Sequence, residues 1–141
     1  MDHISIDKIL SVFKNEYGII LSKLAGKKII FEDESRSIVV AMPFSKVYPR
    51  GNGWVDLTKV QVDLFKSYMH GFIVFRLSSS SIYYVDMKVL LPLLTQDSIH
   101  KNTNEGEHWK LDIWLDKISI RKSDKFLSVK ENDHKCITKC L

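Results

Sequence analysis

Residues 53–86 read GWVDLTKVQVDLFKSYMHGFIVFRLSSSSIYYVD and contain the strongest secondary-structure signals of the chain. Thr58 and Gln61 have the spacing of a capping box, in which each side chain accepts a hydrogen bond from the other residue's backbone amide. This pair predicts the start of a helix that runs to about Met69. Gly71 follows and is expected to end that helix, because glycine adopts the left-handed conformation at little cost.

Two strands and a short helix are predicted to follow. Residues 72–77 (FIVFRL) and 82–85 (IYYV) are rich in β-branched and aromatic residues, and four serines separate them. Such runs on either side of a polar turn are typical of paired strands. Asp86 is expected to cap a short helix over residues 87–94, which Pro92 would bend or shorten.

Upstream, apolar residues recur at three- and four-residue spacing from Ile6 to Leu24 and predict a helix that ends at Gly26. Residues 28–32 and 37–42 are β-rich and predict a hairpin around an Asp-Glu-Ser-Arg turn. The second run is apolar at consecutive positions, which indicates a central strand with both faces buried. Residues 45–53 then form a loop rich in Gly and Pro.

Downstream, residues 95–107 are polar and without period, which predicts a flexible loop. Apolar residues alternate over 109–115 and predict a strand with one buried face. Trp114 falls on its polar face, where it is covered by another element, stacks on a base or marks a partner surface. Ile118 and Ile120 continue in shifted register, which indicates a bulge near Lys117.

The predicted organisation is one α/β domain with a mixed sheet flanked by helices. It occupies residues 1–121, and residues 122–141 are expected to be a basic C-terminal tail with little structure. A chain of 141 residues is long enough to bury a core of this kind. Residues 116–141 hold 7 basic and 4 acidic side chains, whereas residues 1–115 hold 14 and 13, so the excess positive charge gathers near the C-terminus. A basic segment attracts phosphate.

The chain has no run of about 18 apolar residues, and its start, MDHISIDK, lacks the apolar segment of a secretory signal. Its two cysteines, Cys136 and Cys140, both lie in the last six residues, unlike a disulfide framework. These features predict a soluble, cytoplasmic protein without a membrane segment. Motifs of P-loop enzymes, dinucleotide-binding folds, serine hydrolases and zinc peptidases are absent from the sequence.

The order of the predicted elements, with the phrase WVDLTKVQVDLF followed by FIVFRL and IYYVD, resembles the restriction-endonuclease-like PD-(D/E)XK superfamily. The resemblance covers roughly residues 5–94 and implies a mixed sheet flanked by helices. In that family, two acidic residues and a lysine bind Mg²⁺ and position the attacking water. Two carboxylates suit a hard cation, which stabilises charge that develops on phosphate.

The resemblance implies specific site residues in this chain. The catalytic candidates are Asp33, Lys46 and Gln61, and the metal-ligand candidates are Asp33, Glu34 and Asp56, with Mg²⁺ as cofactor if the protein is catalytic. The acid and the lysine of the family's acid-x-Lys pair fall near Ala41 and Pro43, which can neither bind a metal nor move a proton. The literal sequence Asp86-Met87-Lys88 follows a later strand. The motif is therefore degenerate.

The sequence thus predicts a nucleic-acid-binding protein, for DNA or RNA, that has a nuclease-like fold without the chemistry. Its expected phosphate contacts are Lys46, Arg50, Lys59, Arg121, Lys122 and Lys125. Two alternatives stay open. One is an active Mg²⁺-dependent nuclease that uses the acidic candidates. The other is a protein-interaction or homodimerisation domain with contacts at Trp54, Trp114, Tyr83 and Tyr84.

Overall fold

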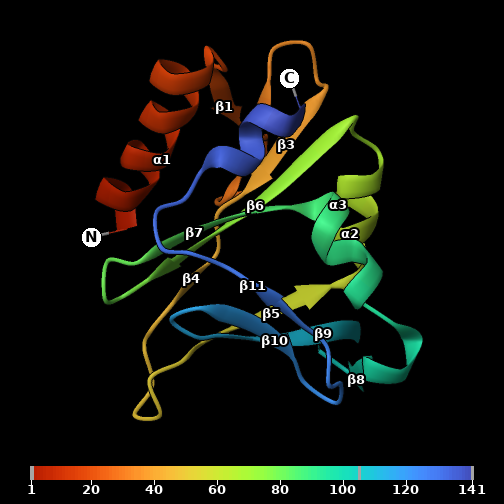
Figure 1. Cartoon of the computed structure of the whole chain (residues 1–141). Coiled ribbons are helices and arrows are strands. Elements are labelled where there is room, and N and C mark those ends of the chain that lie inside the picture. Colours follow the sequence, from red (N-terminus) through yellow and green to blue (C-terminus); the bar gives the residue numbers. More distant parts are fainter. Residues whose placement is uncertain (1, 105, 141) are drawn as a thin grey trace.

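Two β-sheets stack on each other, and the N-terminal helix and a C-terminal 3-10 helix cover the outer face of one of them (Figure 1). The computed structural model describes residues 2–104 and 106–140, and within them it is a single mixed α/β domain. The predicted α/β class, the single domain and the mixed sheet are therefore confirmed, but only one sheet was predicted and the structure has a second.

Sheet A contains both parallel and antiparallel pairs. Its path runs β1-β2-β3-β6, with antiparallel pairing of β1 with β2 and of β2 with β3, and parallel pairing of β3 with β6. After Pro43, the short β4 pairs in parallel with β6 on the same side as β3. Strand β7 pairs antiparallel with β6 on its other side. The strands are β1 (Leu21–Lys23), β2 (Ile30–Asp33), β3 (Ile38–Ala41), β4 (Phe44–Ser45), β6 (His70–Leu77) and β7 (Ile82–Asp86).

Sheet B is antiparallel and has the order β11-β10-β9-β5, with β8 paired to the start of β9. β9 is its central strand, with β5 on one side and both β8 and β10 on the other. The strands are β5 (Gly53–Thr58), β8 (His100–Asn102), β9 (Gly106–Ile113), β10 (Lys117–Ile120) and β11 (Phe126–Ser128).

Two hydrophobic clusters lie on opposite faces of sheet A. The first fills the space between sheet A, sheet B and the helices α2 (Lys59–Lys66) and α3 (Met87–Leu90). The second lies between the other face of sheet A and two covering elements, α1 (Asp2–Tyr17) and the 3-10 helix η3 (Lys135–Cys140). Two further 3-10 turns, η1 (Leu91–Leu93) and η2 (Gln96–Ser98), connect α3 to sheet B. None of the helices in the described residues has the length and apolar character needed to span a membrane.

The capping box at the start of α2 is confirmed. The Gln61 amide donates to Thr58 Oγ1 at 3.1 Å, and the Thr58 amide donates to Gln61 Oε1 at 3.0 Å. The helix ends earlier than predicted, at Lys66, and Gly71 lies inside strand β6. A Cβ atom at Gly71 would lie 2.8 Å from Cδ1 of Phe65, so glycine is needed there because α2 packs closely on the strand, and not as a helix terminator.

The N-terminal helix is also shorter than predicted. It ends at Tyr17, and Gly18 takes a positive φ of 69° there. The Gly18 amide donates to the Lys14 carbonyl, and the Ile19 amide donates to the Phe13 carbonyl. The apolar spacing continues past this point because Leu21 belongs to strand β1, whose pairing with β2 overrides the helical period.

Two predictions in the second half of the chain were wrong. Residues 95–107 are not a flexible loop, because η2 and the β8–β9 hairpin occupy most of this segment. There is also no bulge near Lys117: the chain turns between β9 and β10, and the Trp114 amide donates to the Lys117 carbonyl at 2.8 Å. The shifted register marks the return strand of a hairpin.

The segment predicted to be a tail has structure as far as the described residues extend. Strand β11 pairs with β10, and η3 packs beside β7. Ile137 is fully buried in the second cluster, and the Asn132 amide donates to the Ile82 carbonyl at 2.7 Å. The 3-10 helix η3 is therefore part of the cover of sheet A.

Candidate functional site

The face of sheet B that points away from sheet A is polar and partly exposed. Along β5 and β9, one side of each strand enters the core, and the other side projects outward because side chains alternate across a strand. The pairing register arranges the outward residues in rows. Ser119, Asp112 and Trp54 form one row, Arg121, Lys110 and Asp56 form the next, and His100, His108 and Thr58 form the third.

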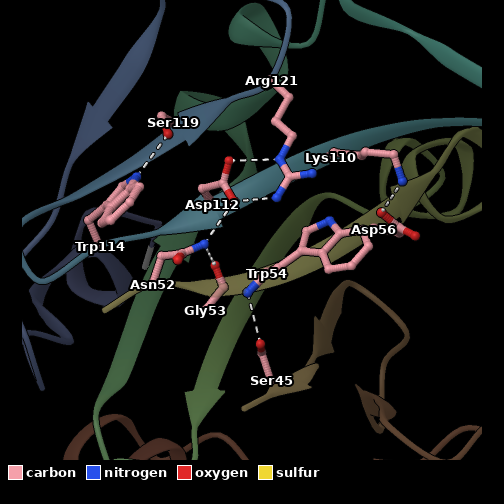
Figure 2. Close-up of polar contacts among 10 residues, drawn as sticks. All are labelled: Ser45, Asn52, Gly53, Trp54, Asp56, Lys110, Asp112, Trp114, Ser119 and Arg121. Atoms are coloured by element: carbon pink, nitrogen blue, oxygen red, sulfur yellow. Dashed lines mark hydrogen bonds and ion pairs between the residues drawn. The ribbon is translucent and has the colours of Figure 1, made fainter. Parts of the chain in front are cut away.

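Asp112 of β9, in the middle of this face, links the segment before β5 to the segment after β10. Its carboxylate accepts hydrogen bonds from Arg121 Nε at 2.9 Å and from the Arg121 terminal nitrogen at 3.0 Å, a bidentate pair (Figure 2). Asn52, which is 7% exposed, donates to the same carboxylate at 3.0 Å and so ties the loop before β5 to the sheet. The hydrogen bond to Asp112 raises the pKa of Arg121, which stays charged.

Cations and aromatic rings alternate across the same face. Lys110 Nζ lies 4.8 Å and Arg121 Cζ lies 4.9 Å from the ring centre of Trp54 (Figure 2). Arg50 Cζ lies 5.9 Å from the ring centre of Trp114, whose indole nitrogen donates to Ser119. We call this the aromatic–cation surface; its members are Tyr48, Arg50, Trp54, Lys110, Trp114, Lys117, Arg121 and Phe126.

The ends of this surface lie in the loop before β5 and on the outer strand β11. Tyr48 is 41% exposed, and its ring centre lies 6.4 Å from that of Trp54. Phe126 is 54% exposed and pairs in register with Ser119. Lys117 Nζ lies 5.4 Å from the centre of the Phe126 ring. Each contact between a cation and a ring contributes a modest attraction of about 0.5–1 kcal/mol at an exposed site.

Two histidines stack at one edge of the face. The rings of His100 and His108 lie 5.7 Å apart, and the Nε2 atom of each is buried without a hydrogen-bond partner among the described residues. Burial, followed by the positive charges of Lys122 and Lys110 and then by His108 and Arg121, lowers the pKa of His100. Burial is the largest of these causes, and the neighbouring positive charges act in the same direction.

The predicted phosphate contacts fall into two groups. Arg50, Arg121 and Lys122 lie on or beside the aromatic–cation surface, and Lys125 lies in the turn that leads from β10 to β11. Lys46 is exposed in the loop after β4. Lys59 begins α2, where its ammonium lies 3.7 Å from the Asp63 carboxylate. The structure therefore brings together part of the predicted set.

The acidic candidates are divided between the two sheets. Asp33 ends β2 and accepts hydrogen bonds from the Ser37 and Ile38 amides at 2.8 and 2.9 Å, while Ser35 donates to its second oxygen. Partial burial alone would raise the pKa of Asp33, but these hydrogen bonds outweigh it and lower the pKa. Asp33 therefore holds the β2–β3 turn, and Glu34 is exposed in that turn.

We expect this turn to make stability sensitive to acid. A carboxylate whose pKa is lowered by folding stabilises the folded state above its unfolded pKa, and this contribution is lost as pH falls through the folded value. Asp33→Asn should lower the free energy of unfolding by about 1 kcal/mol at neutral pH. In urea unfolding, the free energy of unfolding of this variant should also fall less steeply than that of the wild type between about pH 5 and pH 2. Glu34→Gln, at the exposed neighbouring carboxylate, is the control and should retain the wild-type slope.

The structure does not group the metal-ligand candidates in one place. Asp56 lies on the outer face of sheet B, where Lys110 Nζ contacts its carboxylate at 3.3 Å. Gln61 uses its side-chain oxygen in the capping box. In residues 2–104 and 106–140, no three acidic, histidine or cysteine side chains are grouped as a metal site would require. Ala41, near which the resemblance would place an acidic residue, is buried in the centre of sheet A.

Several residues of the surface were missed by sequence reasoning. Lys110 and Asp112 alternate with the buried residues of β9, and this alternation is visible in the sequence. The sequence does not show which residues lie next to them on the neighbouring strands. Tyr48 and Phe126 lie in segments predicted to be loop or tail. Tyr83 and Tyr84, predicted to be contact residues of a partner surface, are 1% and 8% exposed and pack inside the two clusters, so that prediction was wrong.

Comparison with models of protein families, with curated proteins and with solved structures finds no match to this chain.

Proposed function

We propose that this protein binds nucleic acid through the aromatic–cation surface and does not cleave it. The observation that carries the proposal is the arrangement of Arg121 and Lys110 against Trp54 and of Arg50 against Trp114 on one sheet face. Cations supply attraction for phosphates, and aromatic rings supply stacking surfaces for bases. Lys122 and Lys125 add positive charge in the turn between β10 and β11 of the same sheet.

A restriction-endonuclease-like frame is part of the proposal. It is supported by the mixed character of sheet A, in which an antiparallel β2–β3 hairpin is followed by the parallel strand β6. The absence of cleavage is supported by Ala41 and Pro43 at the positions of the family's acid and lysine. The engagement of Asp33 in its turn and of Asp56 with Lys110 adds to this support.

The first test compares two charge-matched variants by fluorescence anisotropy with labelled oligonucleotides. One variant combines Arg50→Gln, Arg121→Gln and Lys122→Gln, since glutamine retains a hydrogen-bond donor for Asp112. We expect it to bind about 10- to 100-fold more weakly at about 0.1 M salt, with a salt slope reduced by roughly 2.

The control combines Lys8→Gln, Lys14→Gln and Lys27→Gln, which remove the same charge. Lys8 and Lys14 are exposed on α1, and Lys27 is exposed in the turn between β1 and β2. This control should retain wild-type affinity and slope. Equal losses in both variants would mean that binding follows net charge alone, and wild-type protein that binds no oligonucleotide would refute the proposal.

The second test addresses cleavage. Wild-type protein is incubated with single-stranded, duplex and branched DNA in the presence of Mg²⁺ or Mn²⁺, and we expect no product. Cleavage that disappears in Asp33→Ala or Asp56→Ala would overturn the non-catalytic part of the proposal and favour an active nuclease.

A further inference from the structure

The geometry of the aromatic–cation surface also indicates which form of nucleic acid it suits. Its rings come from separate segments of the chain: Tyr48 lies in the loop before β5, Trp54 on β5, Trp114 in the turn between β9 and β10, and Phe126 on the outer strand β11. The cross-strand row of Trp54, Asp112 and Ser119 continues in register to Phe126. Trp54 and Phe126 lie at the two ends of this row. The Trp114 indole donates to Ser119 in the same row, and the Tyr48 ring centre lies 6.4 Å from that of Trp54, so the rings follow a line that crosses the strands.

Cations lie beside the rings along this line. In the described part of the chain, four contacts between a cation and a ring belong to this surface, contributed by Arg50, Lys110, Lys117 and Arg121. Asp112 uses two of the Arg121 nitrogens and holds the guanidinium in place, and a guanidinium has further donors that can meet a phosphate. Arg121 is 42% exposed, so these donors are accessible to a ligand.

We propose that the ligand is a single-stranded nucleic acid whose bases stack on Trp54, Trp114 and Phe126 while Arg50 and Arg121 contact its phosphates. This inference rests on the proposed function. Unpaired bases expose flat faces that stack on aromatic side chains, whereas the bases of a duplex already stack on one another. Duplex DNA is commonly read by a helix inserted into its major groove, and the described helices α1, α2 and α3 do not belong to this surface.

The stacking has a simple consequence for the cations. A base that stacks on Trp54 displaces Lys110 from contact with the indole, and the released ammonium lies next to the incoming phosphate. The Trp54 indole nitrogen is buried without a hydrogen-bond partner among the described residues, so it loses no hydrogen bond when the ring is covered. Stacking and phosphate contact are therefore compatible at the same position.

The test with wild-type protein uses three labelled oligonucleotides of equal length: a single strand, the corresponding duplex, and a strand without bases that keeps the same phosphates. We expect the single strand to bind at least about 10-fold more tightly than either of the others. Equal binding of all three, with a steep salt dependence, would overturn the single-strand inference and leave the proposed function standing. Binding of none of them would overturn both.

Two variants and a matched control complete the test. Trp54→Ala should weaken single-strand binding by roughly 5- to 150-fold and leave binding of the base-free strand unchanged. Phe126→Ala should act in the same direction. Phe44→Ala is the control, since Phe44 is also an exposed phenylalanine with a cation, Arg76, 5.6 Å from its ring centre, but lies on β4 of sheet A.

Circular dichroism shows whether each variant is folded. The comparison of the three oligonucleotides uses only wild-type protein, so it does not depend on the folding of any variant. An equal loss in Phe44→Ala and Trp54→Ala would overturn the assignment of the stacking surface. Tighter binding of an acidic peptide than of any oligonucleotide would assign the surface to a protein partner instead and would overturn both proposals.

Discussion

Phe13→Ala is expected to lower the free energy of unfolding by about 3–5 kcal/mol. Phe13 is fully buried between α1 and sheet A, and its ring meets Phe72 of β6 edge-on, with ring centres 5.8 Å apart. Removing the ring exposes the central strand and leaves a cavity that α1 can fill only by shifting. The cost therefore combines lost burial of apolar area with lost packing around the cavity.

Urea unfolding followed by circular dichroism measures this effect. Lys14→Ala changes the neighbouring, exposed residue of the same helix and should change the free energy of unfolding by less than about 0.5 kcal/mol. A loss below about 1 kcal/mol for Phe13→Ala would mean that α1 does not cover sheet A in solution.

The second large effect is expected at the other end of the chain. Ile137→Ala should lower the free energy of unfolding by about 2–5 kcal/mol, because Ile137 is fully buried in the same cluster as Phe13. The segment around it is held by contacts to distant residues: the Tyr17 hydroxyl lies 2.6 Å from His134 Nδ1 and donates to the His134 carbonyl at 2.9 Å. Without the Ile137 side chain, we expect the 3-10 helix η3 and the residues next to it to detach from sheet A.

The control is Lys135→Ala, an exposed position two residues before the anchor, which should leave stability within about 0.5 kcal/mol of the wild type. A single unfolding transition with a reduced midpoint is expected for Ile137→Ala. An unchanged midpoint would mean that residues 130–140 behave as the tail that the sequence predicted.

Local signals predicted the elements that form through nearby contacts. The Thr58–Gln61 capping box, the Asp86 cap of α3 and the β2–β3 hairpin are all present, because the groups that define each of them lie within a few residues. The burial of both faces of β3 was also predicted correctly, since consecutive apolar residues require cover on both sides.

The errors arose where pairing with distant residues overrode a local pattern. Leu21 fits the helical period of α1 but pairs with Asp33 in sheet A. His100 lies in a polar stretch that reads as a loop, yet it pairs with His108 on β9. The face that α2 turns toward the core is also set by the sheets around it: Val60 is 76% exposed, whereas Val62 is buried.

For the candidate site, too, the sequence predicted individual residues but not their neighbours across the sheet. Arg50, Arg121 and Lys122 were predicted to be phosphate contacts from their charge alone, and the structure gathers them near sheet B. Their relation to Trp54 was not predictable, because it depends on the register between β5, β9 and β10. The bidentate pair of Arg121 with Asp112 likewise requires two strands to be adjacent.

By itself, the stretch from Gly53 to Asp86 determined a capped helix followed by two paired strands, since capping and turn formation act over a few residues. It did not predict that residues 53–58 form a strand, β5, which joins a second sheet with β9, a strand more than 50 residues later. That partnership arises from long-range hydrogen bonds and from burial of the apolar faces of both strands, which no local pattern encodes. The aromatic–cation surface exists only because of it.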